Sequence, residues 1–344
     1  APVLPDYITP GGAHEGDSSV NPALYNTDYN KGNIYQITKA NKNGTDWFHE
    51  IFKPALIQSH TVTASGGGDR SSYLFSVGYF DQQGSAIYTY LKRYSARINT
   101  TFNIKNNVRI GENAYVVYKQ NPGLNLDING ENIINLIYRT QPIIPVYDIK
   151  GNWAGSNGPE LGNAGNPVAD QTRGKDNITQ NWDVIGNVWG EVDFLKHFTV
   201  RTQFGGTIDN GYYNAYTYHT YENAENNSGN SFAENQFYNS TWDWVNTLTY
   251  NNTFAEKHNV KVLVGSEAIS YTGKVIGGQR LNYFSDDPAL RVINAGSPIN
   301  QQLWGYSAGQ TGTGPFMPGP STLYSLFGRV DYSFAEKYYL GFTL

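Results

Sequence analysis

Residues 180–209, QNWDVIGNVWGEVDFLKHFTVRTQFGGTID, contain two long runs in which apolar and polar side chains alternate, joined by the short connection 195–197. One face of the first run is apolar and comprises Trp182, Val184, Gly186, Val188, Gly190, Val192 and Phe194. The opposite face is mostly polar. Successive side chains of a β-strand point to opposite faces, so this period of two predicts a β-hairpin that separates two unlike environments.

Each run is about twice as long as a usual strand of five or six residues. A tilted strand needs roughly 9–11 residues to cross the hydrocarbon of a bilayer, and both runs supply them. Phe194 and Phe198 flank the connection, where an aromatic girdle would meet the lipid headgroups. The hairpin therefore predicts an all-β fold, the wall of a transmembrane antiparallel β-barrel, with its apolar face toward lipid.

The composition fits such a wall. Aromatic residues reach 15% of the 344 residues, with 27 tyrosines, although apolar residues together make up only 39%. The chain has no cysteine, which excludes disulfides, thiolate metal sites and cysteine nucleophiles. Its net charge of −5 provides no basic surface for nucleic acid, so no nucleic-acid partner is expected.

The alternating pattern recurs along the chain and indicates about ten strands. The further runs cover 60–66, 73–81, 92–104, 108–118, 238–251, 260–271, 323–334 and 338–344. Short connections near 67–72, 105–107, 195–197, 252–259 and 335–337 alternate with long ones at 119–179, 210–237 and 273–322. Outer-membrane barrels have short periplasmic turns and longer extracellular loops, so the long connections are predicted to be extracellular.

The chain divides into two predicted regions. Residues 1–58 are expected to be extracellular and irregular, with a short helix at 46–52, and residues 59–344 form a partial barrel. The last alternating run reaches the final residue and Ala1 is not an initiator methionine. We therefore expect an internal fragment of a longer chain, with at least one strand before it.

A soluble β-sandwich or propeller would also show alternation. Two features argue against it: strands well beyond the usual length recur, and aromatic residues gather beside the short connections. These are Phe102, Phe194, Phe198, Tyr250, Phe254, Phe334 and Tyr338. A membrane interface concentrates rings at one rim, whereas a sandwich has no reason to do so.

Five segments resemble the SusC/RagA family of TonB-dependent outer-membrane transporters of Bacteroidetes-type bacteria. They are TDWFHEIFK at 45–53, QSHTVTASGG at 58–67, SVGYFDQQG at 76–84, KRYSARIN at 92–99 and SLFGRVDYS at 325–333. Each segment is unspecific alone, but their order and spacing are specific. The long connections show no such resemblance.

The resemblance implies a 22-stranded barrel, of which this chain would hold about ten strands, in the bacterial cell outer membrane. It also implies TonB-dependent import of a nutrient oligomer, either a glycan or an oligopeptide, with outer-membrane lipid around the wall. The implied partners are a SusD-like surface lipoprotein and TonB, which would act through a plug lying before Ala1. The alternative from another class is a secreted or surface β-rich protein that binds carbohydrate or mediates adhesion.

No catalytic arrangement is recognisable, so neither enzymatic activity nor a cofactor is expected. The six histidines lack a metal-ligand spacing. Asn125 to Gly130 looks like the start of a calcium loop, but the twelfth position is Leu136, where a bidentate Glu is needed, so no metal site is predicted.

Aromatic residues of the predicted loops are the candidates for substrate binding, because their rings can stack on sugars or on peptide side chains. They are Trp153, Tyr212, Tyr213, Tyr216, Tyr218 and Trp304, with loop packing as the alternative role. Charged residues on the lumen face are instead expected to form a polar ladder. They are Arg93, Arg97, Asp183, Glu191, Arg201, Asp243 and Arg329.

The hairpin provides a matched pair of substitutions. Val188→Arg places a cation on the predicted lipid face, at a cost of about 2–4 kcal/mol near the bilayer midplane, whereas Asn187→Arg faces the wet lumen at little cost. The yield of folded, heat-modifiable barrel in the membrane should fall for Val188→Arg alone. Equal losses for the two variants would contradict the assignment of the faces.

Overall fold

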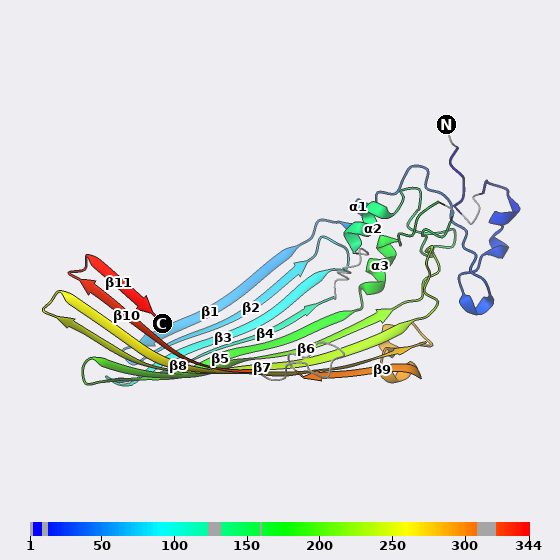
Figure 1. The fold of residues 1–344 in the computed structure, drawn as a ribbon. Coiled ribbons are helices and arrows are strands. Elements are labelled where there is room, and N and C mark those ends of the chain that lie inside the picture. The colour runs from blue at the N-terminus through cyan, green and yellow to red at the C-terminus, as the bar shows by residue number, and fades with distance from the viewer. Residues whose placement is uncertain (1–2, 9–12, 123–131, 159, 308–320) are drawn as a thin grey trace.

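The computed structural model describes residues 3–8, 13–122, 132–158, 160–307 and 321–344. In these ranges eleven strands form one antiparallel sheet, which curves into an open wall (Figure 1). The strands are β1 (Ile57–Gly68), β2 (Ser71–Gln83), β3 (Tyr90–Lys105), β4 (Val108–Asn121), β5 (Ile178–Phe194), β6 (Phe198–Thr217), β7 (Ser231–Phe254), β8 (His258–Leu281), β9 (Ser297–Ser307), β10 (Ser321–Phe334) and β11 (Tyr338–Thr343). The predicted all-β barrel wall is confirmed, as a curved sheet with two open edges.

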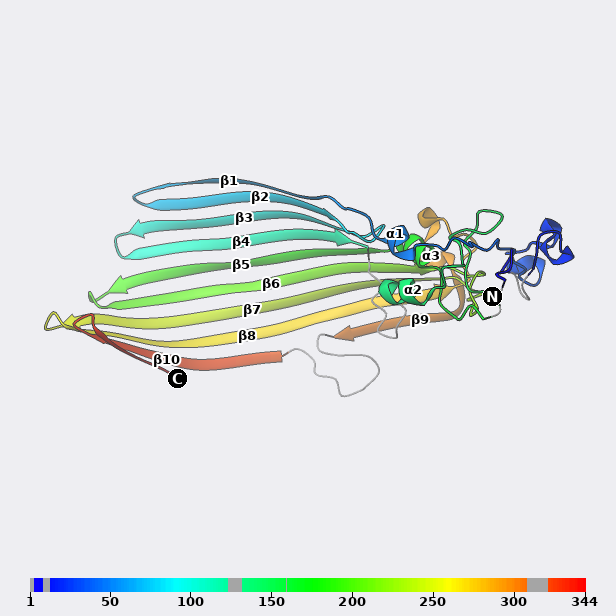
Figure 2. The same cartoon turned by 90° about the horizontal axis from the view of Figure 1, so that it is seen from above.

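Three short α-helices lie at one end of the wall, on its concave side (Figures 1 and 2). They are α1 (Trp47–Ile51), α2 (Ile133–Arg139) and α3 (Pro167–Gly174). The helix predicted at 46–52 is thus confirmed as α1, and the Asp46 side chain caps it by accepting a hydrogen bond from the amide of His49 at 3.0 Å. Single 3₁₀ turns are η1 (Ser18–Val20), η2 (Pro22–Leu24), η3 (Tyr29–Lys31), η4 (Pro288–Leu290) and η5 (Ile293–Ala295).

None of the helices within the described ranges is long and apolar enough to cross a membrane.

The five predicted short connections lie at the opposite end of the wall, which we call the turn end, whereas residues 84–89 connect β2 to β3 at the other end (Figure 2). At the centre of the β5–β6 connection, Leu195 and Lys196 have φ angles of 50° and 65°, and Ala255–Glu256 and Ala335–Glu336 repeat this left-handed pair. Two consecutive left-handed residues match the right-handed twist of the flanking strands. The end that carries the helices and long connections is called the loop end.

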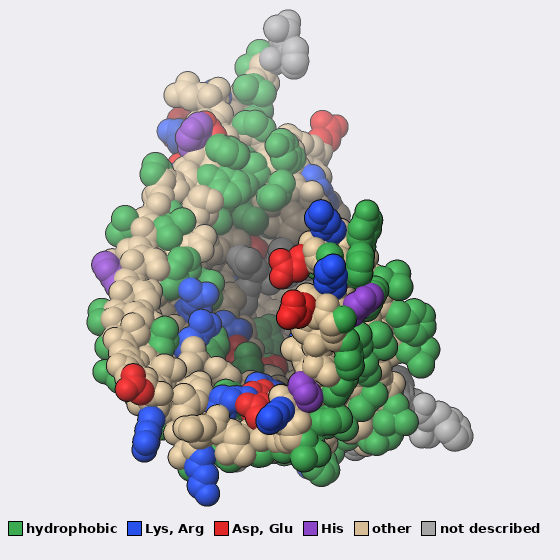
Figure 3. Space-filling model, turned by 90° about the vertical axis from the view of Figure 1, so that its left-hand side faces the viewer, with side chains coloured by type: hydrophobic (Ala, Val, Ile, Leu, Met, Phe, Trp, Pro, Cys, Tyr) green, Lys and Arg blue, Asp and Glu red, His purple; other side chains and the backbone are tan. Residues whose placement is uncertain are grey.

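The two faces of the wall differ as the hairpin predicted. Val188 and Phe204 lie opposite each other on the convex face and are 57% and 53% exposed. Seen from the turn end, hydrophobic side chains gather on the outside, most densely on one side, and Lys, Arg, Asp and Glu gather in the central hollow (Figure 3). Glu112 departs from the pattern, because it shares the convex face with its partner Val188 and accepts a hydrogen bond from Thr100.

Charged side chains of the concave face pair across strands. Arg109 lies 2.6 Å from Glu191 and 2.7 Å from Asp193, and Arg201 reaches Glu191 at 3.5 Å. Other members of the predicted ladder take separate partners: Asp183 pairs with Lys119, Arg93 packs over Phe80 and Arg97 over Tyr115, while Arg329 pairs with Asp331 on its own strand. Asp243 lies opposite Gly205. The concave wall is therefore a network of local ion pairs and cation–π contacts.

Aromatic residues form two bands on the convex face. The band beside the turns was predicted, and in it the rings of Phe198 and Tyr250 lie 5.0 Å apart. A second band crosses β2 to β5, where Tyr79, Tyr94, Tyr118 and Trp182 make successive ring contacts of 4.7–6.2 Å. Along β5 the bands are about twelve residues apart, or about 40 Å. At a tilt near 45° this is about 28 Å of depth, close to the apolar band of about 25 Å in outer-membrane barrels.

Two predicted loops are shorter than expected. Residues 210–217 continue β6 and residues 231–237 belong to β7, so the connection predicted at 210–237 is only 218–230. The connection predicted at 273–322 contains β9, which raises the strand count from about ten to eleven. The reason is that strands continue to pair beyond the bilayer, where both faces are wet and the apolar alternation disappears.

β9 and β10 lie end to end along the same side of β8 (Figure 2). β9 pairs with residues 274–281 of β8, and β10 pairs with residues 258–271 in the same antiparallel sense. Together they occupy the place of one long strand, with β9 forming its loop-end half.

Residues 1–344 expressed alone should not yield a soluble monomer. The edges β1 and β11 offer unpaired backbone groups, and the apolar convex face far exceeds the few hundred Å² that a soluble monomer exposes. We expect aggregation in detergent-free buffer, measured by size-exclusion chromatography with light scattering. A monodisperse monomer with a sharp melting transition would contradict the barrel fold.

Candidate functional site

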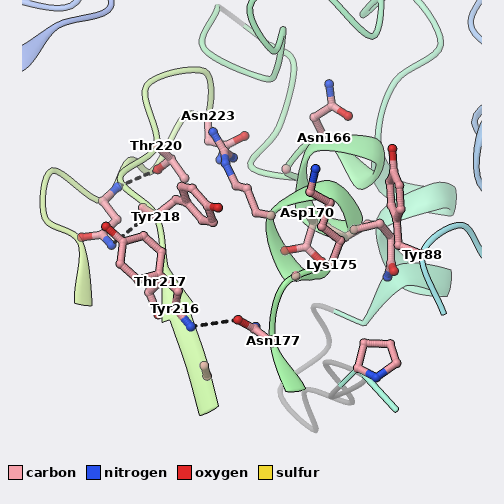
Figure 4. Close-up of a pocket in the computed structure, with 18 of the residues that line it drawn as sticks. Tyr88, Asn166, Asp170, Lys175, Asn177, Tyr216, Thr217, Tyr218, Thr220 and Asn223 are labelled. Carbon is pink, nitrogen blue, oxygen red and sulfur yellow. Dashed lines mark hydrogen bonds between the residues drawn. The ribbon is translucent and has the colours of Figure 1, made fainter. Parts of the chain in front are cut away.

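A cavity of about 580 Å³ opens at the loop end, between the end of β6, helix α3 and the segment 218–227 (Figure 4). Its lining combines tyrosine rings with amides, hydroxyls and a few charges, and includes Tyr88, Asn166, Asp170, Arg173, Lys175, Asn177, Tyr213, Thr217, Tyr218 and Asn223. Such a lining suits a polar ligand with several hydroxyl or amide groups.

Helix α3 forms one side of the cavity and is fixed at its N-terminus. Pro167 occupies the first turn, and the Asn166 side chain accepts hydrogen bonds from the amides of Val168 and Ala169. The side-chain nitrogen Nδ2 of Asn166 donates to the backbone carbonyls of Val146 and Ala154 at 2.9 and 2.7 Å. Asn166 is almost fully buried, so these bonds lock the helix to the long loop.

An ion pair holds the segment 218–227 against α3. Arg173 donates to both carboxylate oxygens of Glu222 at 2.5 and 3.1 Å, and Glu222 is completely buried. Burial lowers the pKa of Arg173, but the hydrogen bonds and charge of Glu222 outweigh it, so the pKa lies above its usual value. The pair fixes the second side of the cavity.

A cluster of side chains covers the loop-end part of β6 on the convex face. The hydroxyl of Tyr216 donates to Asp286 at 2.6 Å, and the guanidinium of Arg291 lies 4.1 Å from the centre of the Tyr216 ring. Burial and the bond to Asp286 raise the pKa of Tyr216. Phe232 and Tyr283 complete this cluster, which packs the connection after β8 onto the strands.

The structure relocates most of the six predicted substrate-binding aromatics. Tyr212, Tyr213 and Tyr216 lie on β6 and Trp304 on β9, so their placement on loops was wrong, while Tyr218 directly follows β6 and Trp153 does lie in a loop. Their strand positions follow from the continuation of the sheet beyond the bilayer. Tyr213, Tyr216 and Tyr218 contribute to the cavity lining.

The remaining three lie elsewhere. Trp153 stacks on Tyr147 with ring centres 5.1 Å apart, and Tyr212 donates to Glu234 at 2.6 Å on the convex face. Trp304 lies further along the sheet. The six residues therefore do not form one site.

The residues of α3 were not predicted as part of a site, because residues 119–179 were expected to be a loop. The one available signal was Asn166-Pro167, a capping residue followed by proline, which is typical of a helix start. Among the described residues there is no group of three or more acidic or histidine side chains arranged to hold a metal ion. The suspected calcium-loop start at 125–130 lies outside the described ranges.

A tilted antiparallel wall with a lipid-facing exterior, two aromatic bands and a charged interior defines a section of an outer-membrane β-barrel. Comparison with known proteins narrows this class. No protein-family model matches the chain. It is 25% identical over 309 residues to TonB-dependent receptor P3 of Formosa agariphila, covering 87% of this chain and 29% of the receptor.

The chain is also 23% identical over 336 residues to TonB-dependent receptor SusC of Bacteroides thetaiotaomicron, covering 87% of this chain and 30% of SusC. Among solved structures, the RagAB peptide transporter superposes with a TM-score of 0.70 at 21% identity, over 88% of this chain and 33% of that chain. The chain thus spans less than a third of the length of these curated relatives.

These matches confirm the resemblance to SusC-like TonB-dependent receptors and the location of the wall in the outer membrane. The curated relatives are named receptors rather than enzymes, in agreement with the expected lack of enzymatic activity. They give no support to the alternative of a secreted carbohydrate-binding or adhesive protein.

The Arg173–Glu222 pair predicts how the cavity is held together. Removing one partner of a buried ion pair costs about 3–5 kcal/mol, so Glu222→Ala should release the segment 218–227. Backbone amides of this segment, measured by hydrogen exchange in the full-length barrel, should then exchange at least about a hundredfold faster. Glu225→Ala, at an exposed position of the same segment, is the control, and equal exchange in both variants would refute the role of the pair.

Proposed function

We propose that this chain is part of the barrel wall of a TonB-dependent importer, which carries a nutrient oligomer, a glycan or an oligopeptide, across the outer membrane. The observation that carries the proposal is the polar cavity at the loop end of a wall whose convex face is built for lipid. The similarity to receptors named TonB-dependent supports the energy source.

The loop end is proposed to be extracellular, because outer-membrane barrels carry their long connections outside. Residues 1–58 would then belong to the extracellular region, and 59–344 to the partial barrel. Contacts between the first region and the long loop support this division: Tyr25 donates to Asp148 at 2.6 Å, and the amide of Thr45 donates to the carbonyl of Pro142 at 2.8 Å. Burial and the Asp148 bond raise the pKa of Tyr25 to about 12, so this link stays protonated at neutral pH.

The cavity is proposed as a place where the substrate rests before it passes along the lumen. Tyrosine rings and amides offer contacts to many chemically similar units, which suits an oligomer better than a single small ion. Between the cavity and the turn end the concave face is charged. Its ion pairs would keep that surface hydrated while the substrate passes.

Two partners are proposed from the similarity to SusC and to the RagAB transporter. One is a SusD-like surface lipoprotein, which would close the loop end over the cavity. The other is TonB, which would act through a plug region of the transporter.

Gene deletion combined with uptake measurement tests this function. A deletion strain should lose growth on one member of a panel of glycans and peptides supplied as the sole nutrient, and the full-length gene should restore it. Uptake of that nutrient should fall at least tenfold when a protonophore collapses the energy that TonB transmits. Unchanged growth of the deletion strain on every nutrient of the panel, or uptake indifferent to the protonophore, would refute the proposal.

A further inference from the structure

Four residues lie side by side across the concave face at the loop end. Tyr213 of β6 faces Asn235 of β7, Asn235 faces Gly277 of β8, and Gly277 faces Trp304 of β9. Directly opposite residues have Cβ atoms about 4.5–5.5 Å apart, so the two aromatic rings flank one amide within a single row. This row belongs to the concave face because Tyr213 lies an even number of residues from Arg201 on β6, whose side chain pairs with Glu191 on that face.

The Trp304 side chain crosses over β8 to reach Asn235. Its indole Nε1 donates to Oδ1 of Asn235 at 2.6 Å. Gly277 makes this path available, because a Cβ at that position would lie 2.4 Å from the indole Nε1 and 2.4 Å from Oδ1 of Asn235. The indole therefore passes over Gly277, its orientation is fixed by the bond to Asn235, and it is only half-buried.

The row also presents unused hydrogen-bond donors. Within the described residues, neither the Nδ2 amide of Asn235 nor the hydroxyl of Tyr213 donates a hydrogen bond to the protein. The Tyr213 side chain is half-buried, and burial raises its pKa, so the hydroxyl keeps its proton. Both side chains are only half-buried, so their donors are accessible to a ligand.

Among the side chains that the structure describes, the neighbouring rows of the concave face carry no ionisable group on these strands. Toward the loop end they consist of Ala215, Ala233, Gln279 and Gln302, and toward the turn end of Gly211, Phe237 and Val275. The row is thus the centre of an uncharged patch, rich in amides and rings, which borders the charged cavity at Tyr213.

We propose that Tyr213, Asn235 and Trp304 form a subsite for one neutral sugar residue of an oligosaccharide. This inference rests on the proposed import function and assigns it a substrate class. The apolar C–H face of a pyranose packs on the fixed indole, while the sugar hydroxyls accept hydrogen bonds from the Asn235 amide and the Tyr213 hydroxyl.

The chemistry of the patch favours a neutral sugar over a charged peptide. Ionised side chains or termini of a peptide would lose hydration against this surface without meeting an opposite charge. Hydroxyl groups satisfy the free donors, and an aromatic plane matches the flat apolar face of a ring.

The test measures binding of maltohexaose, cellohexaose, mannohexaose and xylohexaose to the full-length protein by isothermal titration calorimetry. A peptide of Gly, Ser and Ala serves as the uncharged comparison. At least one hexasaccharide should bind the wild type, and Trp304→Ala should raise its Kd about tenfold or more. Tyr213→Phe, which removes only a hydroxyl, should raise the Kd about fivefold, the effect of losing one hydrogen bond.

Leu303→Ala is the matched control, because Leu303 precedes Trp304 on β9 and points to the opposite, exposed face. Its Kd should equal that of the wild type, and heat-modifiable migration should show that every variant is folded. Failure of all four hexasaccharides to bind, or a Kd that Trp304→Ala and Tyr213→Phe leave unchanged, overturns the subsite. Binding of the peptide alone overturns the sugar assignment but does not contradict the proposed import function. The import function is tested separately by growth of the deletion strain.

Discussion

Backbone hydrogen bonding inside a bilayer is the constraint on which this structure depends. Hydrocarbon offers no partner to a peptide group, so a sheet can cross only when each strand pairs with neighbours on both sides. Strands β1 to β8 meet this demand, because each pairs with the next along the chain and most of these pairs have no register shift. Once the backbone is paired, the side chains need only place apolar groups outward and polar groups inward.

The same sheet serves a different purpose beyond the second aromatic band. There the strands leave the lipid, and the convex face of β6 is covered by the Tyr216, Phe232 and Tyr283 cluster rather than by acyl chains. On the concave face, α3 and the Arg173–Glu222 pair enclose the cavity. Continued strand pairing thus provides a rigid support on which the recognition surface is built.

The sequence predicted the parts of the fold that lie within the membrane and missed those outside it. Alternation through Trp182 to Phe194 revealed β5 and its faces because lipid strongly favours apolar side chains. The extension of β6 through Tyr212 to Thr217 was read as a loop, since polar and aromatic residues suit both of its wet faces. The second aromatic band was not predicted, because its members, such as Tyr94 and Trp182, lie on different strands. Only the register of strand pairing brings them together.

The sequence predicted which types of residue form the candidate site but not how they are arranged. Tyr213 and Trp304 were singled out as aromatic, yet their common row depends on the pairing of four strands and on the missing side chain of Gly277. The Arg173–Glu222 pair joins residues 49 positions apart in the chain. No local pattern encodes such a contact.

The face assignment of β5 can be measured directly, because this chain has no cysteine of its own. Single cysteines placed in turn at positions 182 to 194 of a cysteine-free full-length protein would carry a nitroxide label in lipid bilayers. Collisions with oxygen should be highest at even positions and collisions with a water-soluble nickel chelate at odd positions, with a period of two. Equal access of the nickel chelate to both sets of positions would contradict a strand that separates lipid from lumen.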